Sequence, residues 1–127
     1  MSIKKIITGL TLSLLLGTGV ASANWGDVYY CQMTNLVEMT LDGKMTSYTS
    51  QKFQFKLDQT KNAMVFGSTS YFTDLVFELV KDASFPNLEN WYAKDQFSST
   101  YFNDGKLVYT HNSSATALLI SADCDKF

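Results

Sequence analysis

The sequence predicts an all-β domain, a small closed or nearly closed antiparallel barrel of about seven or eight strands in meander order. Three observations predict this fold: runs in which apolar and polar residues alternate, turn dipeptides between those runs, and one cysteine in each of the first and last runs. Pairing the first strand with the last would close the sheet and remove its edges. A two-sheet β-sandwich is the alternative that the same strands allow.

The first 23 residues have the pattern of a bacterial secretory signal peptide that is cleaved before residue 24. Lys4 and Lys5 are followed by the apolar run 6–20 and by the small-x-small site Ala21-Ser22-Ala23. The apolar run is short for a membrane-spanning helix. Residues 24–127 are therefore expected to form a single soluble β-domain in the periplasm or outside the cell.

Cys31 and Cys124 are the only cysteines in the chain. Export would take them to a compartment where disulfides persist, and two cysteines allow one pairing. A bridge between them would close nearly the whole domain into one loop. The chain-entropy model assigns roughly 4.7 kcal/mol to a loop of about 100 residues. Two free thiols are the alternative.

The first predicted strand covers residues 28–41 and alternates apolar and polar residues. Its apolar side is assigned Tyr29, Cys31, Met33, Val37, Met39 and Leu41. Asn35 and Leu36 break the alternation, which predicts a β-bulge at that point. Asp42-Gly43 then predicts a hairpin turn.

The next run, residues 44–58, places Phe53, Phe55 and Leu57 on one side, and a turn at 59–62 leads to a strand at 63–67. Residues 68–80 fit either a strand or a helix, and the β-rich surroundings favour a strand. In that strand the inward side is assigned Tyr71, Leu75, Phe77 and Leu79.

Residues 81–96 are predicted to be irregular and contain the only proline, Pro86. Such a loop either plugs one end of a barrel or covers a ligand as a lid. The candidate lid residues are Phe85, Leu88, Trp91 and Tyr92.

The last three runs are predicted to be strands at 97–102, 106–111 and 115–124, joined by turns at 103–105 and 112–114. In the final strand Cys124 shares the apolar side with Leu118, Ile120 and Ala122. Both cysteines thus lie on the apolar sides of their strands, and their thiols are expected to face one interior.

The charge balance of residues 24–127 argues against nucleic acids and anionic membranes as partners. The segment has eight lysines, no arginine and twelve acidic residues, a formal charge of −4. No catalytic sequence motif is present, and the single histidine, His111, lies beside a predicted turn. We therefore expect no enzymatic activity, no cofactor and no metal.

Aromatic residues are the most informative feature of the composition, with eighteen in residues 24–127. Most fall on inward positions and favour a filled barrel. Four fall on outward positions and form a candidate partner-binding set: Tyr30, Tyr48, Phe72 and Phe102.

The composition and the aromatic pattern together predict a non-enzymatic, monomeric protein-interaction or binding module. Two alternatives are a carrier of a small apolar ligand inside the barrel, because small barrels can hold one, and a periplasmic inhibitor of a cell-wall enzyme such as lysozyme.

The early "YYCQMT" and the terminal "CDKF" resemble a family of short exported bacterial proteins that has no assigned function, so the resemblance implies no activity and no site residues. The chain also resembles, in architecture, periplasmic lysozyme inhibitors of the MliC type, which are small exported β-barrels with a disulfide between their ends. Their signature is a Ser-Gly pair followed shortly by Tyr, and then a Phe-Trp-x-Lys-Gly segment. Gly67 to Tyr71 resembles the first part, and Trp91 to Lys94 resembles the second. The Ser-Gly pair of that signature and its glycine after the lysine are absent, so no inhibitory residue is assigned.

Overall fold

A computed structural model describes residues 23–80 and 91–127, and these residues contain strands and turns but no helix. The segment predicted to be a signal peptide lies outside the described residues, apart from Ala23. The strands are β1 (Val28–Thr40), β2 (Met45–Ser47), β3 (Lys52–Asp58), β4 (Ala63–Phe66), β5 (Val76–Glu78), β6 (Trp91–Lys94), β7 (Ser98–Asn103), β8 (Lys106–Asn112) and β9 (Thr116–Lys126).

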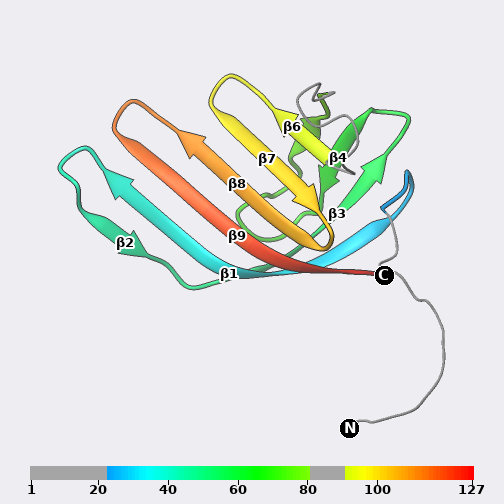
Figure 1. Cartoon of the computed structure of the whole chain (residues 1–127), viewed down its shortest axis with the longest axis horizontal. Coiled ribbons are helices and arrows are strands. Elements are labelled where there is room, and N and C mark those ends of the chain that lie inside the picture. The colour runs from blue at the N-terminus through cyan, green and yellow to red at the C-terminus, as the bar shows by residue number, and fades with distance from the viewer. Residues whose placement is uncertain (1–22, 81–90) are drawn as a thin grey trace, which may run out of the picture.

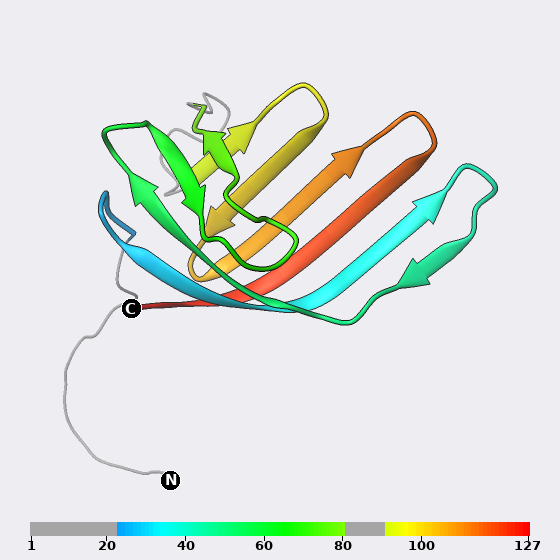
Figure 2. The same ribbon diagram turned by 180° about the vertical axis from the view of Figure 1, so that it is seen from behind.

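Eight of the strands form a nearly closed antiparallel barrel in the order β5-β4-β3-β1-β9-β8-β7-β6, and the short β2 pairs with the far half of β1. The long strands β1 and β9 lie side by side in the middle of the sheet, whereas β3, β4 and β5 curl back over β6 and β7 (Figures 1 and 2). The predicted barrel and the predicted pairing of the first strand with the last are both confirmed.

One seam of the barrel, between β5 and β6, is not sealed by a full ladder. Among the described residues, a single bridge joins Leu79 to Ala93, and the N–H of Val80 donates to the carbonyl of Tyr92 at 2.7 Å. The barrel therefore opens here, and not between its first and last strands.

Local turn chemistry fixes the hairpins as the sequence predicts. Asp104 and Gly105 both have positive φ values, 52° and 73°, as a type I′ hairpin turn requires. Gly105 also packs against β9, because a Cβ there would lie 3.0 Å from the carbonyl oxygen of Cys124. At the other hairpin, Gly43 has a φ of 84°.

A bulge at Thr34 corrects the predicted sides of the first strand. The pairing of β1 with β9 shifts between Met33 and Asn35, close to the predicted break. One inserted residue sends every later side chain to the opposite face. Leu36 is consequently buried, while Met39 and Leu41, predicted to be inside, are exposed.

Aromatic side chains fill the interior, where Phe102 packs on Tyr29 at 4.6 Å and Phe72 packs on Phe66 at 4.6 Å between ring centroids. The prediction that Phe72 and Phe102 point outward is wrong, since each is 1% exposed. Residues 68–75 form turns and not a strand. Two-residue alternation therefore does not apply to Phe72, and its neighbour Tyr71, predicted to be inside, is exposed.

Phe102 is buried because it shares its side of β7 with Ser98 and Thr100, and that side faces the interior of the barrel. Ser98, Thr100 and Phe102 share the inner side of this strand, and Tyr101 lies on the outer side. Serine and threonine at inner positions reverse the side that the sequence pattern assigns to the rest of the strand.

Candidate functional site

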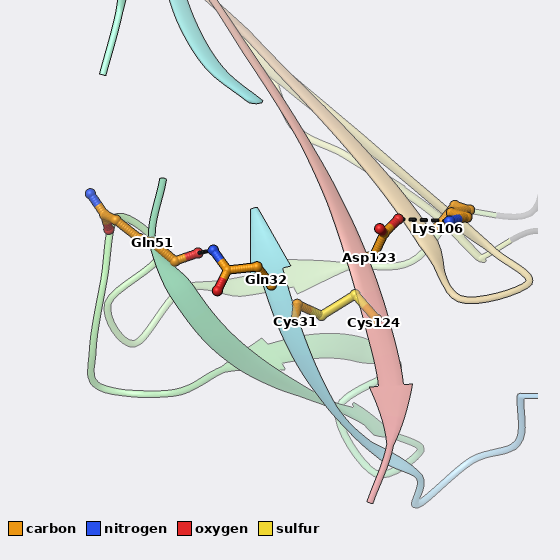
Figure 3. The surroundings of a disulfide bond; sticks show 6 residues. All are labelled: Cys31, Gln32, Gln51, Lys106, Asp123 and Cys124. Carbon is orange, nitrogen blue, oxygen red and sulfur yellow. Dashed lines mark hydrogen bonds and ion pairs between the residues drawn. A yellow bond between two sulfur atoms is a disulfide. The ribbon is translucent and has the colours of Figure 1, made fainter. Parts of the chain in front are cut away.

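The predicted disulfide is present and ties the two longest strands together. Cys31 and Cys124 are directly opposed in the β1–β9 ladder, with their Cα atoms 4.0 Å apart, and both are buried (Figure 3). Bridges of this kind are typical of proteins in oxidising compartments. The bond fixes the sheet that carries the surfaces described below.

Tyr30 and Tyr48 are exposed as predicted, but the structure does not bring them together. Tyr30 lies on the outside of β1, with its ring 5.3 Å from that of Phe127. Tyr48 is opposite the inward-facing Leu36, and its hydroxyl donates to Glu38 at 2.8 Å. Because cross-strand partners share a face, the two tyrosines lie on opposite faces of the sheet. The hydrogen bond to Glu38 raises the pKa of Tyr48.

The predicted lid is only partly described. Phe85 and Leu88 lie outside the described residues, and the other two candidates are strand residues, which corrects their assignment to a loop. Trp91 packs against the core and meets Trp25 at 5.0 Å, and Tyr92 stacks on Tyr101 at 4.4 Å between ring centroids. β6 was not predicted from the sequence, because its four residues were included in the segment 81–96 that was predicted to be irregular.

A row of mostly polar side chains crosses the inner face of β1, β9, β8 and β7. Glu38, Leu118, His111 and Ser98 occupy matching positions on β1, β9, β8 and β7. His111 Nδ1 and Ser98 Oγ are 2.5 Å apart, and the hydroxyl of Tyr109 donates to the same Ser98 oxygen at 3.2 Å. In the next row inward, the hydroxyl of Thr100 is buried without a hydrogen-bond partner among the described residues.

The hydrogen bonds of this row link β7 to β8. The row does not have the geometry of a serine–histidine–carboxylate site. Ser98 is buried, and its oxygen already accepts a hydrogen bond from Tyr109. Glu38 is separated from His111 by the whole of β9, which puts their backbones roughly 10 Å apart at a strand spacing of about 4.8 Å. A catalytic triad needs the carboxylate within hydrogen-bond reach of the imidazole.

Stability is expected to fall above about pH 10. Burial, and secondarily hydrogen bonding to Tyr71, raises the pKa of Tyr109, and burial with the charge of Asp27 raises the pKa of Tyr29. A phenol whose pKa is higher in the folded state stabilises the fold fully below its unfolded pKa. That contribution is lost above it, by up to about 1.4 kcal/mol per pH unit for each group.

Urea unfolding measured between pH 8 and 12 checks this expectation. Tyr109→Phe should make the alkaline slope shallower, because one fewer phenol with a raised folded-state pKa ionises when the chain unfolds. Equal slopes for Tyr109→Phe and the unchanged protein between pH 10 and 12 would contradict the assignment.

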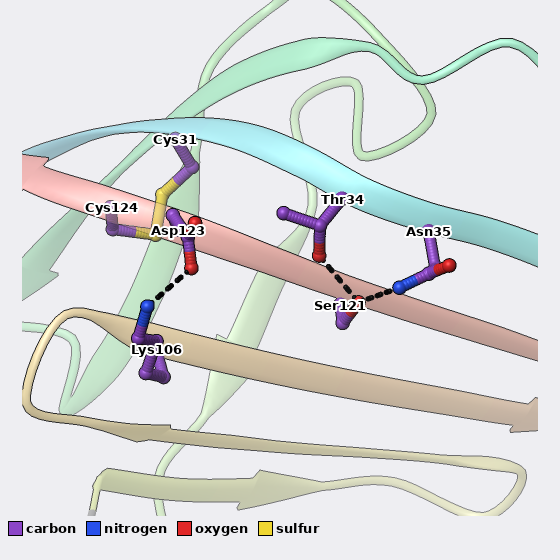
Figure 4. Close-up of polar contacts among 7 residues, drawn as sticks. All are labelled: Cys31, Thr34, Asn35, Lys106, Ser121, Asp123 and Cys124. Atoms are coloured by element: carbon purple, nitrogen blue, oxygen red, sulfur yellow. Dashed lines mark hydrogen bonds and ion pairs between the residues drawn. A yellow bond between two sulfur atoms is a disulfide. The ribbon is translucent and has the colours of Figure 1, made fainter.

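The outer face of β1, β9, β8 and β7 carries a surface that sequence alternation did not predict. From the bulge to the far ends of these four strands, no outward-facing residue is charged. The nearest charges on this face are Lys106 and Asp123, which form an ion pair 2.7 Å long (Figure 4). The face instead presents apolar and aromatic side chains with small polar residues between them.

The outer apolar band consists of the large apolar residues of this surface together with three neighbours, Leu41 after β1, Met45 on β2 and Tyr92 on β6. It runs diagonally across six strands. Tyr101 is opposite both Tyr92 and Val108, Leu119 is opposite Val37, and Met39 is opposite Met45. Between β8 and β9 the step is diagonal, since Val108 is opposite Ser121 and Leu119 is opposite Thr110. The members are Val37, Met39, Leu41, Met45, Tyr92, Tyr101, Val108 and Leu119. Six strands at about 4.8 Å and five residues at about 3.3 Å give a footprint of roughly 450 Å², which includes the small polar residues between the band's members.

Two features border the outer apolar band. At the bulge, Thr34 and Asn35 both hydrogen-bond to Ser121 Oγ, at 2.7 and 2.9 Å, which holds the turned segment of β1 against β9 (Figure 4). At the β6–β8 end, a cleft of about 220 Å³ is lined by Lys94, Ser99 and Thr110 among others.

Sequence reasoning missed the outer apolar band because it assigned Val37, Met39 and Leu41 to the core. The signal that could have found it is the bulge itself. An inserted residue at the break reverses the sides of 37, 39 and 41, and so predicts exposed apolar residues next to the Asp42-Gly43 turn.

Comparisons of the chain with protein-family models, with curated proteins and with solved structures find no match. Within residues 23–80 and 91–127, no helix is long and apolar enough to cross a membrane, and no cluster of acidic, histidine or cysteine side chains has the geometry of a metal site. The resemblances noted in the sequence stay predictions.

Proposed function

We propose that this protein is an exported, non-enzymatic interaction module that binds another protein through the outer apolar band. The observation that carries the proposal is the continuity of this uncharged, partly aromatic surface across six strands. The largest exposed apolar patch on an ordinary monomer covers about 300–600 Å² and often has a function. The footprint of the band, together with the small polar residues between its members, is of that size, and 17% of the chain is charged.

The composition of the band supports a protein partner. Charged residues are depleted and tyrosine and methionine are enriched at the centres of protein interfaces, and the band has both properties. Its rim is polar, with Lys94 at one end and the Lys106–Asp123 pair along one side. This arrangement matches an apolar centre inside a polar border.

The packed interior favours a surface site over a ligand held inside the barrel. Phe55, Phe72 and Phe102 are each 1% exposed, and Tyr109 is 4% exposed, so aromatic rings occupy the space between the curled strands. A ligand carrier of this size would need that space for its cargo. The signal-like leader and the disulfide support a partner in the periplasm or outside the cell.

Site-specific photocrosslinking in the organism that makes the protein tests the proposal. Benzoylphenylalanine replaces Val108, inside the band, or Lys56, an exposed residue of β3. We expect a discrete crosslinked protein from position 108 and none from position 56. Adding Leu119→Lys should lower the yield at position 108 at least tenfold, because a charge would be buried in an apolar contact.

Equal crosslinking from positions 108 and 56, or a yield at 108 that Leu119→Lys leaves unchanged, would contradict the proposal. Leu119 is 45% exposed, so this variant is expected to fold, and its melting temperature should stay within a few degrees of the unchanged protein.

A further inference from the structure

We propose that the partner binds by adding an extended strand, antiparallel, to the free edge of β2, so that its side chains continue the outer apolar band. This inference rests on the proposed function and names the form in which the partner is recognised. The partner class is a protein that displays an extended segment with apolar residues at alternate positions. Strand addition draws affinity from main-chain hydrogen bonds and specificity from alternate side chains.

The backbone register shows which groups are available at this edge. The N–H of Thr40 donates to the carbonyl of Lys44 at 3.0 Å, and the N–H of Tyr48 donates to the carbonyl of Leu36 at 2.8 Å. In an antiparallel ladder, hydrogen-bonded pairs alternate with pairs whose N–H and C=O groups point away from each other. Met45 and Ser47 belong to the second kind.

Met45 and Ser47 therefore direct their N–H and C=O groups away from β1. In the part of the chain that the structure describes, no hydrogen bond uses these four groups and no strand lies beyond β2, which is outermost at its side of the sheet (Figure 1). Both residues are exposed, Met45 by 65%. Met45 and Ser47 are two residues apart, so they can form hydrogen-bonded pairs with two alternate residues of an added antiparallel strand.

Side-chain hydrogen bonds on both sides of β2 fix the conformation of this edge. The Asp42 carboxylate accepts hydrogen bonds from the Thr40 hydroxyl and the Lys44 N–H, which fixes the turn between β1 and β2. On the other side, Tyr48 is tied to Glu38. A preformed edge lowers the entropy cost of adding a strand.

The neighbouring side chains indicate what the incoming strand carries. Met45 is opposite Met39, which is opposite Ala117, and Ser47 continues the row of Val37 and Leu119. An added strand would extend these two rows by one residue each. Its outward residue beside Met45 is expected to be apolar, since apolar cross-strand neighbours stabilise a sheet.

A second copy of this chain is a poorer occupant than a different protein. β2 has three residues, so pairing it with its own copy would bury little more than three residues a side. Specific interfaces bury about 800 Å² from each partner. A longer foreign strand with the domain that carries it can cover the band as well, and so reach this area.

The probe for the test is a phage-displayed library of twelve-residue peptides, selected against the oxidised chain of residues 24–127. The best peptide is synthesised with a fluorophore, and its Kd is measured by anisotropy. Ser47→Pro removes one outward N–H, and proline is tolerated where that group faces solvent on an edge strand. We expect Ser47→Pro to weaken binding at least tenfold, and Ser47→Ala, which keeps the N–H, to stay within about twofold.

A second measurement keeps the test independent of the folding of the proline variant. Amide hydrogen exchange of the unchanged protein is followed with and without the peptide. The amides of Met45 and Ser47 should slow at least tenfold on binding, whereas that of Asn62, whose N–H donates to Gln59 within a turn, should not change.

Three results would overturn the inference: no selected peptide with a Kd below about 100 µM, equal binding to Ser47→Pro and the unchanged protein, or no protection at Met45 and Ser47. A concentration-dependent dimer that competes with the peptide would assign the edge to a second copy, and would also overturn it. If Leu119→Lys weakens the peptide and Ser47→Pro does not, the band binds by its face, so the strand mode fails and the proposed function stands.

Discussion

Removal of the Cys31–Cys124 bridge is expected to lower the free energy of unfolding by about 4 kcal/mol. The two cysteines are 93 residues apart in sequence, so the bridge restricts almost the whole unfolded chain, and the chain-entropy model gives about 4.7 kcal/mol for a loop of about 100 residues. A domain of this size has about 5–15 kcal/mol in all. The double variant Cys31→Ala/Cys124→Ala should therefore melt roughly 15–30 °C lower.

Reduction supplies the matched control. The unchanged protein with a phosphine reductant should behave like the double variant, and the reductant should not move the melting temperature of the double variant. β1 and β9 are also paired by a backbone ladder that runs from Tyr29 to Thr40, so we expect the loss to be in stability and not in fold. A shift of less than about 3 °C on reduction would mean that the unfolded chain is restricted by something other than the bridge.

The fold class followed from local chemistry that acts within a few residues. The Asp42-Gly43 and Asp104-Gly105 turns have the positive φ values that hairpins need, and the alternation of Phe53, Phe55 and Leu57 agrees with their burial in β3. Two cysteines on apolar sides were enough to pair the first strand with the last. Each of these inferences needs only the residue types near one point.

The candidate site could not be predicted, because it depends on the side that each strand turns outward. Thr34 is one extra residue in β1, and it moves Met39 and Leu41 from the core to the surface. In β7, Ser98 and Thr100 occupy inner positions, where Ser98 bonds to His111 and Tyr109. Those hydrogen bonds come from the neighbouring strand β8, so the pattern within β7 alone gives no sign of them.

The free edge of β2 was equally hidden, because it depends on how far β3 runs beside β1. The sequence predicted one long run over 44–58, whereas the structure divides it into β2 and β3. Only β3 is paired on its second side, with β4. The outward N–H and C=O groups of Met45 and Ser47 follow from that division.

Phe102→Ala is expected to destabilise the domain by about 3–5 kcal/mol. The ring is 1% exposed and lies 4.6 Å from Tyr29 and 5.1 Å from Phe55, between ring centroids. These contacts join β7 to β1 and β3 across the interior of the barrel. Truncation leaves a cavity into which the surrounding structure relaxes only in part, so both the transfer of the ring and the cavity contribute to the loss.

Tyr101→Ala is the matched variant, one residue away on the other side of the same strand. Tyr101 is 39% exposed and stacks on Tyr92, so its removal should cost about 1 kcal/mol. Urea unfolding of both variants at pH 7 measures the difference. If Tyr101→Ala proved as costly as Phe102→Ala, β7 would have its sides reversed, and Tyr101 would leave the outer apolar band. A large difference together with weakened partner crosslinking in Tyr101→Ala would separate the residue that stabilises the barrel from the residue that binds.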